Sequence, residues 1–346
     1  GLKRGGAFKL VKLLCKNKLV AHDSKPYDGY RLTGKGYDYL ALKALSQRGS
    51  IAAVGIQIGV GKESDIFTVS GEDGSELCLK LHRLGRSFRT IKQNRDYLKP
   101  GQAASWLYMS RLSALKEYAF MKALHEKGFP VPTPIDVNRH CVVMSLASGY
   151  QLNSIQVLRH PSTVFDHLMR LACRLAQCGL IHCDFNEFNT MVNDEEVVTL
   201  IDFPQMISTK HPNAAMYFAR DVRGLVKFFT MKLKFDVDEE GLFDFAGACA
   251  SEAVTRLDTA CRASGFDGCA PDKREGRSRV KVVVDEEEDE DDASDGDGVA
   301  ALRAEFLARA RVDAPAADAP PPPPDTCLVY TSPSPRDRTR ARMPSS

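Results

Sequence analysis

The residues best suited to chemistry are three polar side chains between positions 184 and 202. Asp184 and Asn189 lie five residues apart in the stretch HCDFNEFN. Asp202, in LIDFPQ, is the last residue of the hairpin-like stretch TMVNDEEVVTLID and is predicted to end its second strand. A polar turn is the plain alternative, because Asn and Asp readily bond their own backbone. The order Asp, Asn, Asp instead suits phosphoryl transfer, in which the first Asp faces the attacking group and the other two residues bind Mg²⁺. We therefore predict Asp184 as a catalytic residue and Asn189 and Asp202 as metal ligands.

A glycine-rich turn upstream suits a phosphate-binding loop, because small residues let backbone N–H groups approach phosphate oxygens. The stretch GVGKES, between two strand-like segments, holds the candidate residues Gly59, Gly61, Lys62 and Ser64. A Walker-A loop is the alternative, but it needs a glycine where Ile56 stands and a Ser or Thr directly after the lysine. The turn is therefore predicted to be that of a protein-kinase-like fold.

Lys80 and Glu117 complete the ordered set. In a protein-kinase-like fold a strand lysine holds the α- and β-phosphates of ATP, and a helix glutamate orients that lysine. Lys80 lies in the strand-like stretch ELCLKLHRL, and Glu117 lies in the helical stretch SRLSALKEYAFMKALHEKG, which Gly128 closes. The spacing predicts one apolar helix face, made of Leu112, Leu115, Tyr118 and Met121. The whole set makes ATP and Mg²⁺ the expected cofactors.

The segments that carry these residues predict an α+β fold with two lobes, like that of protein kinases. Alternating strand patterns from GIQIGVGKESDIFTVS to CVVMSLASGY assign residues 51–145 to an N-lobe. The long helical stretch VFDHLMRLACRLAQCGL and the hairpin after it assign residues 146–270 to a C-lobe, which is predicted to be helical from residue 236. Both lobes are needed to bring the predicted site together.

Residues 1–50 predict a partial winged-helix domain, whose first helices are absent. The basic helical stretch AFKLVKLLCKNKLV is followed by a hairpin-like stretch around residues 26–29 and a second helix, KGYDYLALKAL. This pattern is typical of domains that place a helix against nucleic acid, so we predict nucleic-acid contact through the winged helix. A helical cap on the next domain is the alternative.

Composition and charge place limits on partners. No run of 18 apolar residues occurs, which predicts no membrane span, and the ten cysteines form no CxxC pair, which predicts reduced thiols. Residues 285–297 hold 10 acids, so the rest of the chain has 47 Lys and Arg against 35 acids, a net charge of +12. A basic body of this kind predicts a polyanionic partner.

The C-terminal part is charged, Pro-rich and low in complexity, and residues 271–346 are predicted to be disordered. One helix is predicted within them, over the stretch VAALRAEFLARARV. Residues 326–346 resemble the translation of an adapter sequence more than native protein, and they carry no functional prediction.

Four of these stretches resemble the RIO family of atypical protein kinases, and specifically its second subfamily: GVGKESDIF, LKLHRLGRSF, HCDFNEFN and IDFPQM. The resemblance covers about residues 1–235, including a winged helix ahead of the kinase domain. It implies that Lys80 binds the phosphates with Glu117 as its ion-pair partner, and that Asp184, Asn189 and Asp202 have the roles predicted above. It also implies a phosphate contact for Ser64.

The resemblance further implies a hinge that begins after Met144 and reads adenine through backbone groups of residues 145–147, Leu146 among them. The family usually has Glu where Ser145 stands, which leaves backbone recognition intact. The loop after the Lys80 strand is one residue shorter than the family's pattern, and Ser87 and Thr90 are its candidate phosphorylation sites.

Three functions fit these features: an ATPase switch, a Ser/Thr kinase that phosphorylates itself or other proteins, and a catalytically silent scaffold. Asp202 is followed by Pro204 instead of a glycine, and no Ala-Pro-Glu motif follows. Only 18 residues separate Asp202 from Asp221, which is expected to open the next helix. A peptide substrate therefore has little to bind. The intact set of polar residues argues against the scaffold.

The resemblance implies an ATPase or self-phosphorylating switch that acts on the precursor of the small ribosomal subunit. It implies a cytoplasmic location with passage through the nucleus, and Asp202 as the site of an aspartyl-phosphate. Direct attack of water on ATP, with Asp202 only a metal ligand, is the alternative to that covalent route.

Overall fold

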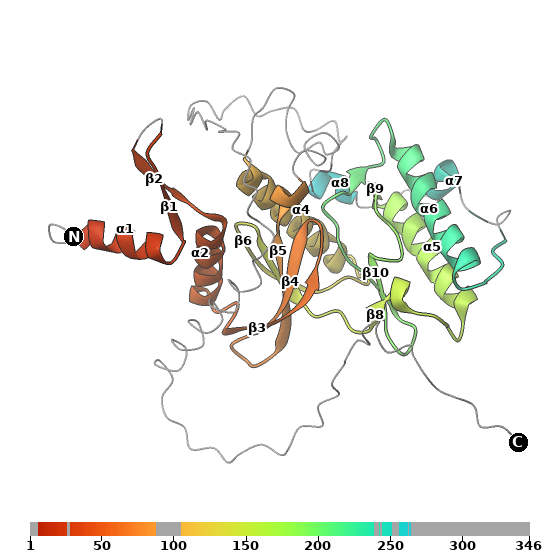
Figure 1. Ribbon diagram of the computed structural model, residues 1–346. Helices are drawn as coiled ribbons and strands as arrows, with labels where there is room; N and C mark the ends of the chain where they lie inside the picture. The colour runs from red at the N-terminus through yellow and green to blue at the C-terminus, as the bar shows by residue number, and fades with distance from the viewer. Residues whose placement is uncertain are drawn as a thin grey trace, which may run out of the picture.

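The structure is a computed structural model of the 346-residue chain (Figure 1). It describes residues 6–25, 28–87, 105–238, 242, 244–250, 256–261 and 263. The predicted tail with its helix, Thr90 and the side chain of Ser87 lie outside the described residues. In the described part of the chain, no helix is long and apolar enough to cross a lipid bilayer.

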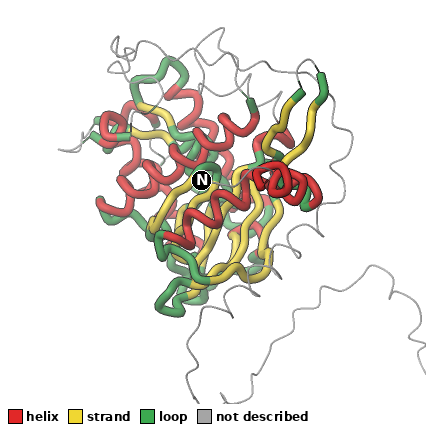
Figure 2. Tube along the Cα trace, turned by 90° about the vertical axis from the view of Figure 1, so that its left-hand side faces the viewer, coloured by secondary structure: helices red, strands yellow, loops and turns green. Residues whose placement is uncertain are grey.

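The N-terminal segment forms the helix–hairpin–helix order that its sequence predicts: α1 (Gly6–Lys16), β1 (Val20–Asp23), β2 (Gly29–Leu32) and α2 (Gly34–Gln47). The hairpin is antiparallel, with Val20 opposite Leu32. Thr33 begins α2, since its hydroxyl oxygen accepts a hydrogen bond of 3.1 Å from the N–H of Gly36. Helix α1 and the hairpin project from the rest of the molecule (Figures 1 and 2).

A five-stranded antiparallel sheet forms the N-lobe, in the order β3-β4-β5-β7-β6. Its strands are β3 (Ala53–Val60), β4 (Ser64–Ser70), β5 (Glu76–His82), β6 (Pro134–Asn138) and β7 (Cys141–Ser145). Side chains alternate between the two faces of a strand. On β5, Leu79 and Leu81 therefore pack in the apolar cluster on one face, whereas Cys78 packs on the other. The same alternation points Lys80 toward the Cys78 face.

Helix α2 covers the first of these faces. Ala41 and Leu45 are fully buried there, in one cluster with Phe67, Leu79 and the other apolar residues of that face. Beside the cluster, Arg48 and Ser50 donate hydrogen bonds to the carboxylate of Asp136 on β6. Helix α2 therefore shares the hydrophobic core of the N-lobe, whereas α1 buries none of its residues.

Helix α4 (Trp106–Glu126) covers the opposite face, and its buried side differs from the predicted one. Of the predicted face, Met121 is buried but Leu115 is 42% exposed. The buried residues are Met109, Ser110, Ser113, Ala114, Glu117, Phe120, Met121 and Leu124. The prediction followed large apolar side chains, whereas small residues and Glu117 face the sheet because they allow close packing and an ion pair. Gly128, with a φ of +67°, closes the helix as expected.

The C-lobe is mainly helical, with α5 (Pro161–Gln177), α6 (Ala214–Met231), α7 (Phe245–Cys249) and α8 (Leu257–Ala260). Its short strands are β8 (Tyr150–Gln151), β9 (Leu180–Ile181), β10 (Thr190–Val192), β11 (Val198–Leu200) and β12 (Ile207–Ser208). Two short 3₁₀ turns, η1 (Leu84–Ser87) and η2 (Leu152–Ser154), complete the described elements. The predicted hairpin of β10 and β11 is present. Beyond residue 236, helix within the described residues is confined to the short α7 and α8.

Candidate active site

Lys80 is the centre of a buried ion-pair group between the lobes. Its ammonium lies 2.7 Å from Oε1 of Glu117 on α4 and 3.0 Å from Oδ1 of Asp202. Burial alone would lower the pKa of Lys80, but the charges of Asp202 and Glu117 outweigh it and raise the pKa above its ordinary value. For Glu117, burial would raise the pKa, and the charge of Lys80 reverses that effect. Both groups are therefore charged at neutral pH.

His82 is a residue of this group that sequence reasoning missed. Its Nε2 lies 2.7 Å from the second oxygen of Glu117, although the two atoms are not aligned for a hydrogen bond. His82 and Lys80 are two residues apart on β5, so their side chains share one face of the strand. That period-two spacing was the available signal.

Asp184 is held by side-chain amides on both of its carboxylate oxygens. Asn186 donates to Oδ1 at 2.8 Å, whereas Asn189 and Gln205 donate to Oδ2 at 2.9 and 3.1 Å. Asn189 also donates to the backbone oxygen of Asp184 at 2.9 Å. Burial, and then the negative charge of Asp202, raise the pKa of Asp184 above its ordinary value. The predicted pair Asp184 and Asn189 is thus in direct contact, and Asn186 and Gln205 join it unpredicted.

Asp202 lies beyond the strand that was expected to end with it, since β11 ends at Leu200. Its backbone is in the left-handed region, with a φ of +70°, a conformation that Asp adopts more readily than most residues. The N–H of Ile201 donates to the oxygen of Asn189 at 3.1 Å, which keeps the two predicted metal ligands on adjoining backbone. The Asp202 side chain is 38% exposed, so it is accessible to solvent.

The segment of the catalytic loop before Asp184 is anchored from helix α6. Asp221 accepts backbone hydrogen bonds from Cys183 and Phe185, and Arg220 donates to the backbone oxygen of Cys183. Burial raises the pKa of Asp221 to about 7. Asp221 was expected to open its helix, but α6 begins at Ala214, so only residues 203–213 separate Asp202 from the helix.

His182 supports the same loop from within the core. Its ring stacks on Phe185 with centroids 5.6 Å apart and also contacts Phe203, at 5.8 Å. Burial lowers the pKa of His182 to about 4, so the ring is neutral at pH 7 and behaves as an aromatic spacer. The loop that carries Asp184 therefore rests on an apolar base.

The predicted phosphate loop is a tight hairpin between β3 and β4. The N–H of Gly61 donates to the oxygen of Ser64 at 2.7 Å, which leaves Lys62 exposed at the tip. Gly59, Ile66 and Lys80 are partners on three neighbouring strands, so the loop adjoins the lysine. A Cβ at Gly59 would lie 3.6 Å from Ile66, an ordinary contact, so the protein's own packing does not require glycine there.

The predicted hinge leaves β7 one strand away from Lys80. Met144 is buried and lies opposite Cys78 on β5. Cys78 is two residues before Lys80, so Met144, Cys78 and Lys80 lie on the same face of the sheet. The N–H of Ser145 donates to the oxygen of Thr133 at 2.9 Å, and its hydroxyl accepts from the N–H of Thr133. The amide of Ser145 is therefore engaged within the protein, which moves the expected adenine contact toward Leu146, a residue that is 38% exposed.

The donor set fits Mg²⁺ bound together with a nucleotide. Because Asn189 donates through its Nδ2 to Asp184, its amide oxygen is left to face a ligand. Mg²⁺ commonly takes one or two protein oxygens, with phosphates and waters completing its shell. Among the described residues no group of three or more His, Cys, Asp or Glu could hold a metal ion.

Family comparisons match both parts of the chain. The model of the RIO domain matches residues 65–242, and the model of the Rio2 N-terminal region matches residues 1–48. "Serine/threonine-protein kinase rio2" of Dictyostelium discoideum is 58% identical over 266 residues, which are 77% of this chain and 50% of that protein. The protein of the same description from Schizosaccharomyces pombe is 48% identical over 270 residues, 77% of each chain. The chain thus spans about half the length of the D. discoideum relative.

Two solved structures of the Rio2 kinase from Chaetomium thermophilum share the fold. One is 46% identical, with a TM-score of 0.66, over 75% of this chain and 82% of that one. The other, an ADP/Mg²⁺-phosphoaspartate complex, is 39% identical, with a TM-score of 0.67, over 90% and 87%. The predicted fold and the predicted family are confirmed by these matches. The chain belongs to the Rio2 subfamily of the RIO-domain serine/threonine-protein kinases.

Proposed function

We propose that this chain is a Mg-ATP-dependent atypical kinase with ATPase activity, in which the γ-phosphoryl group passes to Asp202. We further propose that the phosphorylated and free states form a switch in maturation of the small ribosomal subunit precursor, in the cytoplasm with passage through the nucleus. The ADP/Mg²⁺-phosphoaspartate complex of the C. thermophilum relative supports the first proposal. The location and the ribosomal partner rest on the family resemblance.

The environments of Asp184 and Asp202 indicate which of the two accepts the phosphoryl group. Both oxygens of Asp184 accept hydrogen bonds from side-chain amides, which engage their lone pairs and make its carboxylate the poorer nucleophile of the two. Asp202 is 38% exposed and lies 3.0 Å from the Lys80 ammonium, which favours the ionised carboxylate. An exposed, ionised carboxylate is the better acceptor for a phosphoryl group.

The reaction then has two displacements at phosphorus. A carboxylate oxygen of Asp202 forms a bond to the γ-phosphorus of ATP while the bond to the β-phosphate oxygen breaks, and ADP leaves. In the second step a water oxygen attacks the phosphorus of the acyl phosphate, the bond to Asp202 breaks, and inorganic phosphate leaves. Asp184 orients that water and takes up its proton, a role that its raised pKa favours.

Asn189 and Asp202 would hold the Mg²⁺, and Lys80, oriented by Glu117, would hold the α- and β-phosphates. When bound, the ion neutralises charge on the phosphate oxygens. The protein's own contribution is to fix the lysine and the two aspartates around one point.

Transfer to another protein is the second candidate, and the structure offers it little support. Residues 203–213 connect Asp202 to α6, and they include only β12, which pairs with β9. That connection is too short for the peptide platform of a typical protein kinase.

Helix α1 supports the nucleic-acid part of the proposal. It buries none of its residues, and Lys9, Lys12, Lys16 and the following Lys18 are all exposed. Arg31 on the hairpin pairs with Asp23 at 2.7 Å, but both groups are about half exposed, so the pair is weak and can exchange for phosphate.

The test of the covalent route uses γ-labelled ATP, an acid quench and hydroxylamine, which cleaves acyl phosphates but not phosphoserine. We expect label that is released by hydroxylamine and absent from Asp202→Asn. Asp184→Asn should retain label longer, because hydrolysis is slowed. Hydroxylamine-resistant label, or full label in Asp202→Asn, would instead indicate the Ser/Thr kinase.

A further inference from the structure

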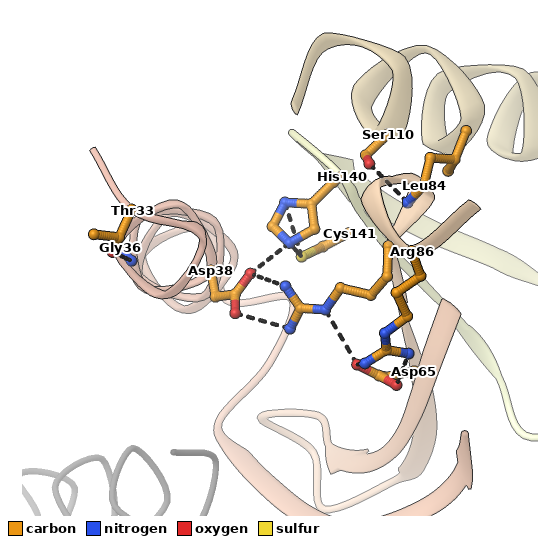
Figure 3. Close-up of polar contacts among 10 residues, drawn as sticks. Thr33, Gly36, Asp38, Asp65, Leu84, Arg86, Ser110, His140 and Cys141 are labelled. Atoms are coloured by element: carbon orange, nitrogen blue, oxygen red, sulfur yellow. Dashed lines mark hydrogen bonds and ion pairs between the residues drawn. The ribbon is translucent and has the colours of Figure 1, made fainter. Parts of the chain in front are cut away.

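Four charged side chains form a continuous chain of hydrogen bonds from α2 to the phosphate loop. They alternate in sign: Asp38 on α2, Arg83 after β5, Asp65 on β4 and Arg86 on η1. None of the four was among the predicted nucleotide-site residues. Figure 3 shows Asp38 and His140 at one end of this chain, and Asp65 and Arg86 at the other.

The first half joins the N-terminal segment to the sheet. Arg83 donates through both terminal nitrogens to the carboxylate of Asp38, at 2.7 and 2.8 Å, and His140 donates to the same carboxylate at 2.7 Å. Asp38 is 7% exposed. Burial would raise its pKa, but the hydrogen bond from His140 and the charge of Arg83 outweigh it and hold the pKa below its usual value. The planar two-bond geometry fixes Arg83 in orientation as well as position.

The second half reaches the loop itself. The remaining nitrogen of Arg83, Nε, donates to Asp65 at 3.1 Å, and Arg86 donates to both oxygens of Asp65 at 2.8 and 2.9 Å. The same Arg86 nitrogen that binds Oδ1 of Asp65 also donates to the backbone oxygen of Gly61 at 3.1 Å. The N–H of Arg83 donates to the oxygen of Glu63 at 2.6 Å. The loop is therefore bound by residues of this series at Gly61 and at Glu63.

The four linked side chains have balanced charges, and each is restrained by its neighbours. Two carboxylates face two guanidinium groups, and His140 is neutral because burial lowers its pKa. Asp38 and Asp65 are buried, so removing either partner of a pair leaves a charge that water cannot reach. Each buried carboxylate therefore depends on the arginines beside it.

We propose that Asp38 and Arg86 are positioning residues for the phosphates of ATP. In this proposal Arg86 binds the Gly61 carbonyl and keeps it turned away from the phosphates, so that the loop's N–H groups face them. Asp38 fixes the position of Arg86 indirectly, through Arg83 and Asp65. The inference rests on nucleotide binding at this loop but not on which group accepts the phosphoryl group. It makes α2 a part of the nucleotide site, although α2 lies on the far face of the sheet.

One consequence is reciprocal coupling. Any ligand that binds the N-terminal segment and shifts α2 changes the affinity for ATP, and ATP changes the affinity for that ligand by the same factor.

The test measures binding of Mg-ATP and of AMP to the full chain by calorimetry, with the melting temperature measured in parallel. The variants are Arg86→Gln, Asp38→Asn and the double variant. Arg86 is 41% exposed, and Asp65 keeps its hydrogen bond from Arg83 in Arg86→Gln, so this variant should fold with at most a lower melting temperature. The control is Arg48→Gln, which removes another ion pair between α2 and the sheet, Arg48 to Asp136 at 2.9 Å, with no link to the loop.

We expect Arg86→Gln and Asp38→Asn each to weaken ATP binding by roughly five- to tenfold, the effect of losing one ordinary hydrogen bond. AMP binding should hardly change, because the loop holds the β- and γ-phosphates. The double variant should bind ATP little worse than either single variant, since both substitutions interrupt the same series of hydrogen bonds. Arg48→Gln should leave ATP binding unchanged.

The inference would be overturned if the variants lost affinity for ATP and AMP equally, or if Arg86→Gln bound ATP as tightly as wild type. It would also be overturned if the losses of ATP affinity added up in the double variant, or if Arg48→Gln weakened ATP binding by the same factor. If Asp38→Asn does not fold, Asp38→Glu replaces it, because it keeps the charge and moves the carboxylate by one methylene. The results expected for Asp38→Glu, and those that would overturn the inference, are the same as for Asp38→Asn. A wild-type chain that binds no ATP would overturn the nucleotide site and this inference together.

Discussion

The ammonium of Lys80 lies 2.7 Å from the carboxylate of Glu117, and the two side chains expose only 8% and 2% of their surface. This pair joins β5 to α4 across the second face of the sheet. A second hydrogen of the ammonium is available to Asp202, at 3.0 Å. The distance between the helix and the sheet therefore decides whether Lys80 reaches Asp202.

Replacing Glu117 by Ala should cost both stability and turnover. Lys80 would remain buried beside a single partner, and breaking a buried pair typically destabilises a protein by about 3–5 kcal/mol. ATP turnover should fall by more than about tenfold, as expected when a positioning partner of a phosphate-binding group is lost. Chemical denaturation and phosphate release measure the two effects. Lys122→Ala, an exposed change on the same helix, is the control.

Replacing Asn189 by Ala should abolish Mg²⁺-dependent turnover while the chain stays folded. The variant loses the amide oxygen predicted to bind the metal, and also the two hydrogen bonds that orient Asp184. We expect a loss of more than about tenfold, measured as phosphate release over a Mg²⁺ titration. Asn213→Ala is the matched control, because the Asn213 side chain makes no capping hydrogen bond to α6. Normal Mg²⁺-dependent turnover in Asn189→Ala would contradict the metal assignment.

Replacing Asp221 by Asn should change how stability depends on pH. Its folded pKa of about 7 exceeds the unfolded value of 3.8, so the folded state holds an extra proton between these values and loses stability as pH rises. The Asn variant has no such loss, so it should gain relative to wild type by up to about 4 kcal/mol from pH 4 to pH 7. Denaturant unfolding at each pH measures the difference. A difference that does not vary with pH would show that Asp221 titrates normally.

Reversing the charge of the four exposed lysines on and after α1 should weaken RNA binding and its salt dependence. Each lost phosphate contact should reduce the slope of log affinity against log salt by about 0.7–0.9. The measurement is binding of an rRNA fragment at several salt concentrations. Reversal of Lys122 and Lys227, which are exposed on α4 and α6, serves as the control. Equal affinity and slope before and after reversal would make the N-terminal segment a protein-binding module.

Sequence by itself determined the order of the chemical groups and the elements that carry them. Alternation of apolar and polar residues predicts the strands of the N-lobe, because side chains of a strand alternate between its faces. The position of Lys80 between Leu79 and Leu81 already implied that it points away from their cluster. The stretch HCDFNEFN likewise placed Asp184 and Asn189 in one short polar segment, and the structure joins them by a hydrogen bond of 2.9 Å.

Only the tertiary structure decided which surfaces meet. The buried side of α4 is set by Glu117 and small residues, because an ion pair and close approach to the sheet outweigh the burial of Leu115. The left-handed backbone of Asp202 depends on the neighbouring chain, and no local spacing indicates it. Asp38 and Arg83 are 45 residues apart, and their pairing follows from the packing of α2 on the sheet. Local patterns report only the periodicity of one element, whereas these contacts depend on the relative placement of two.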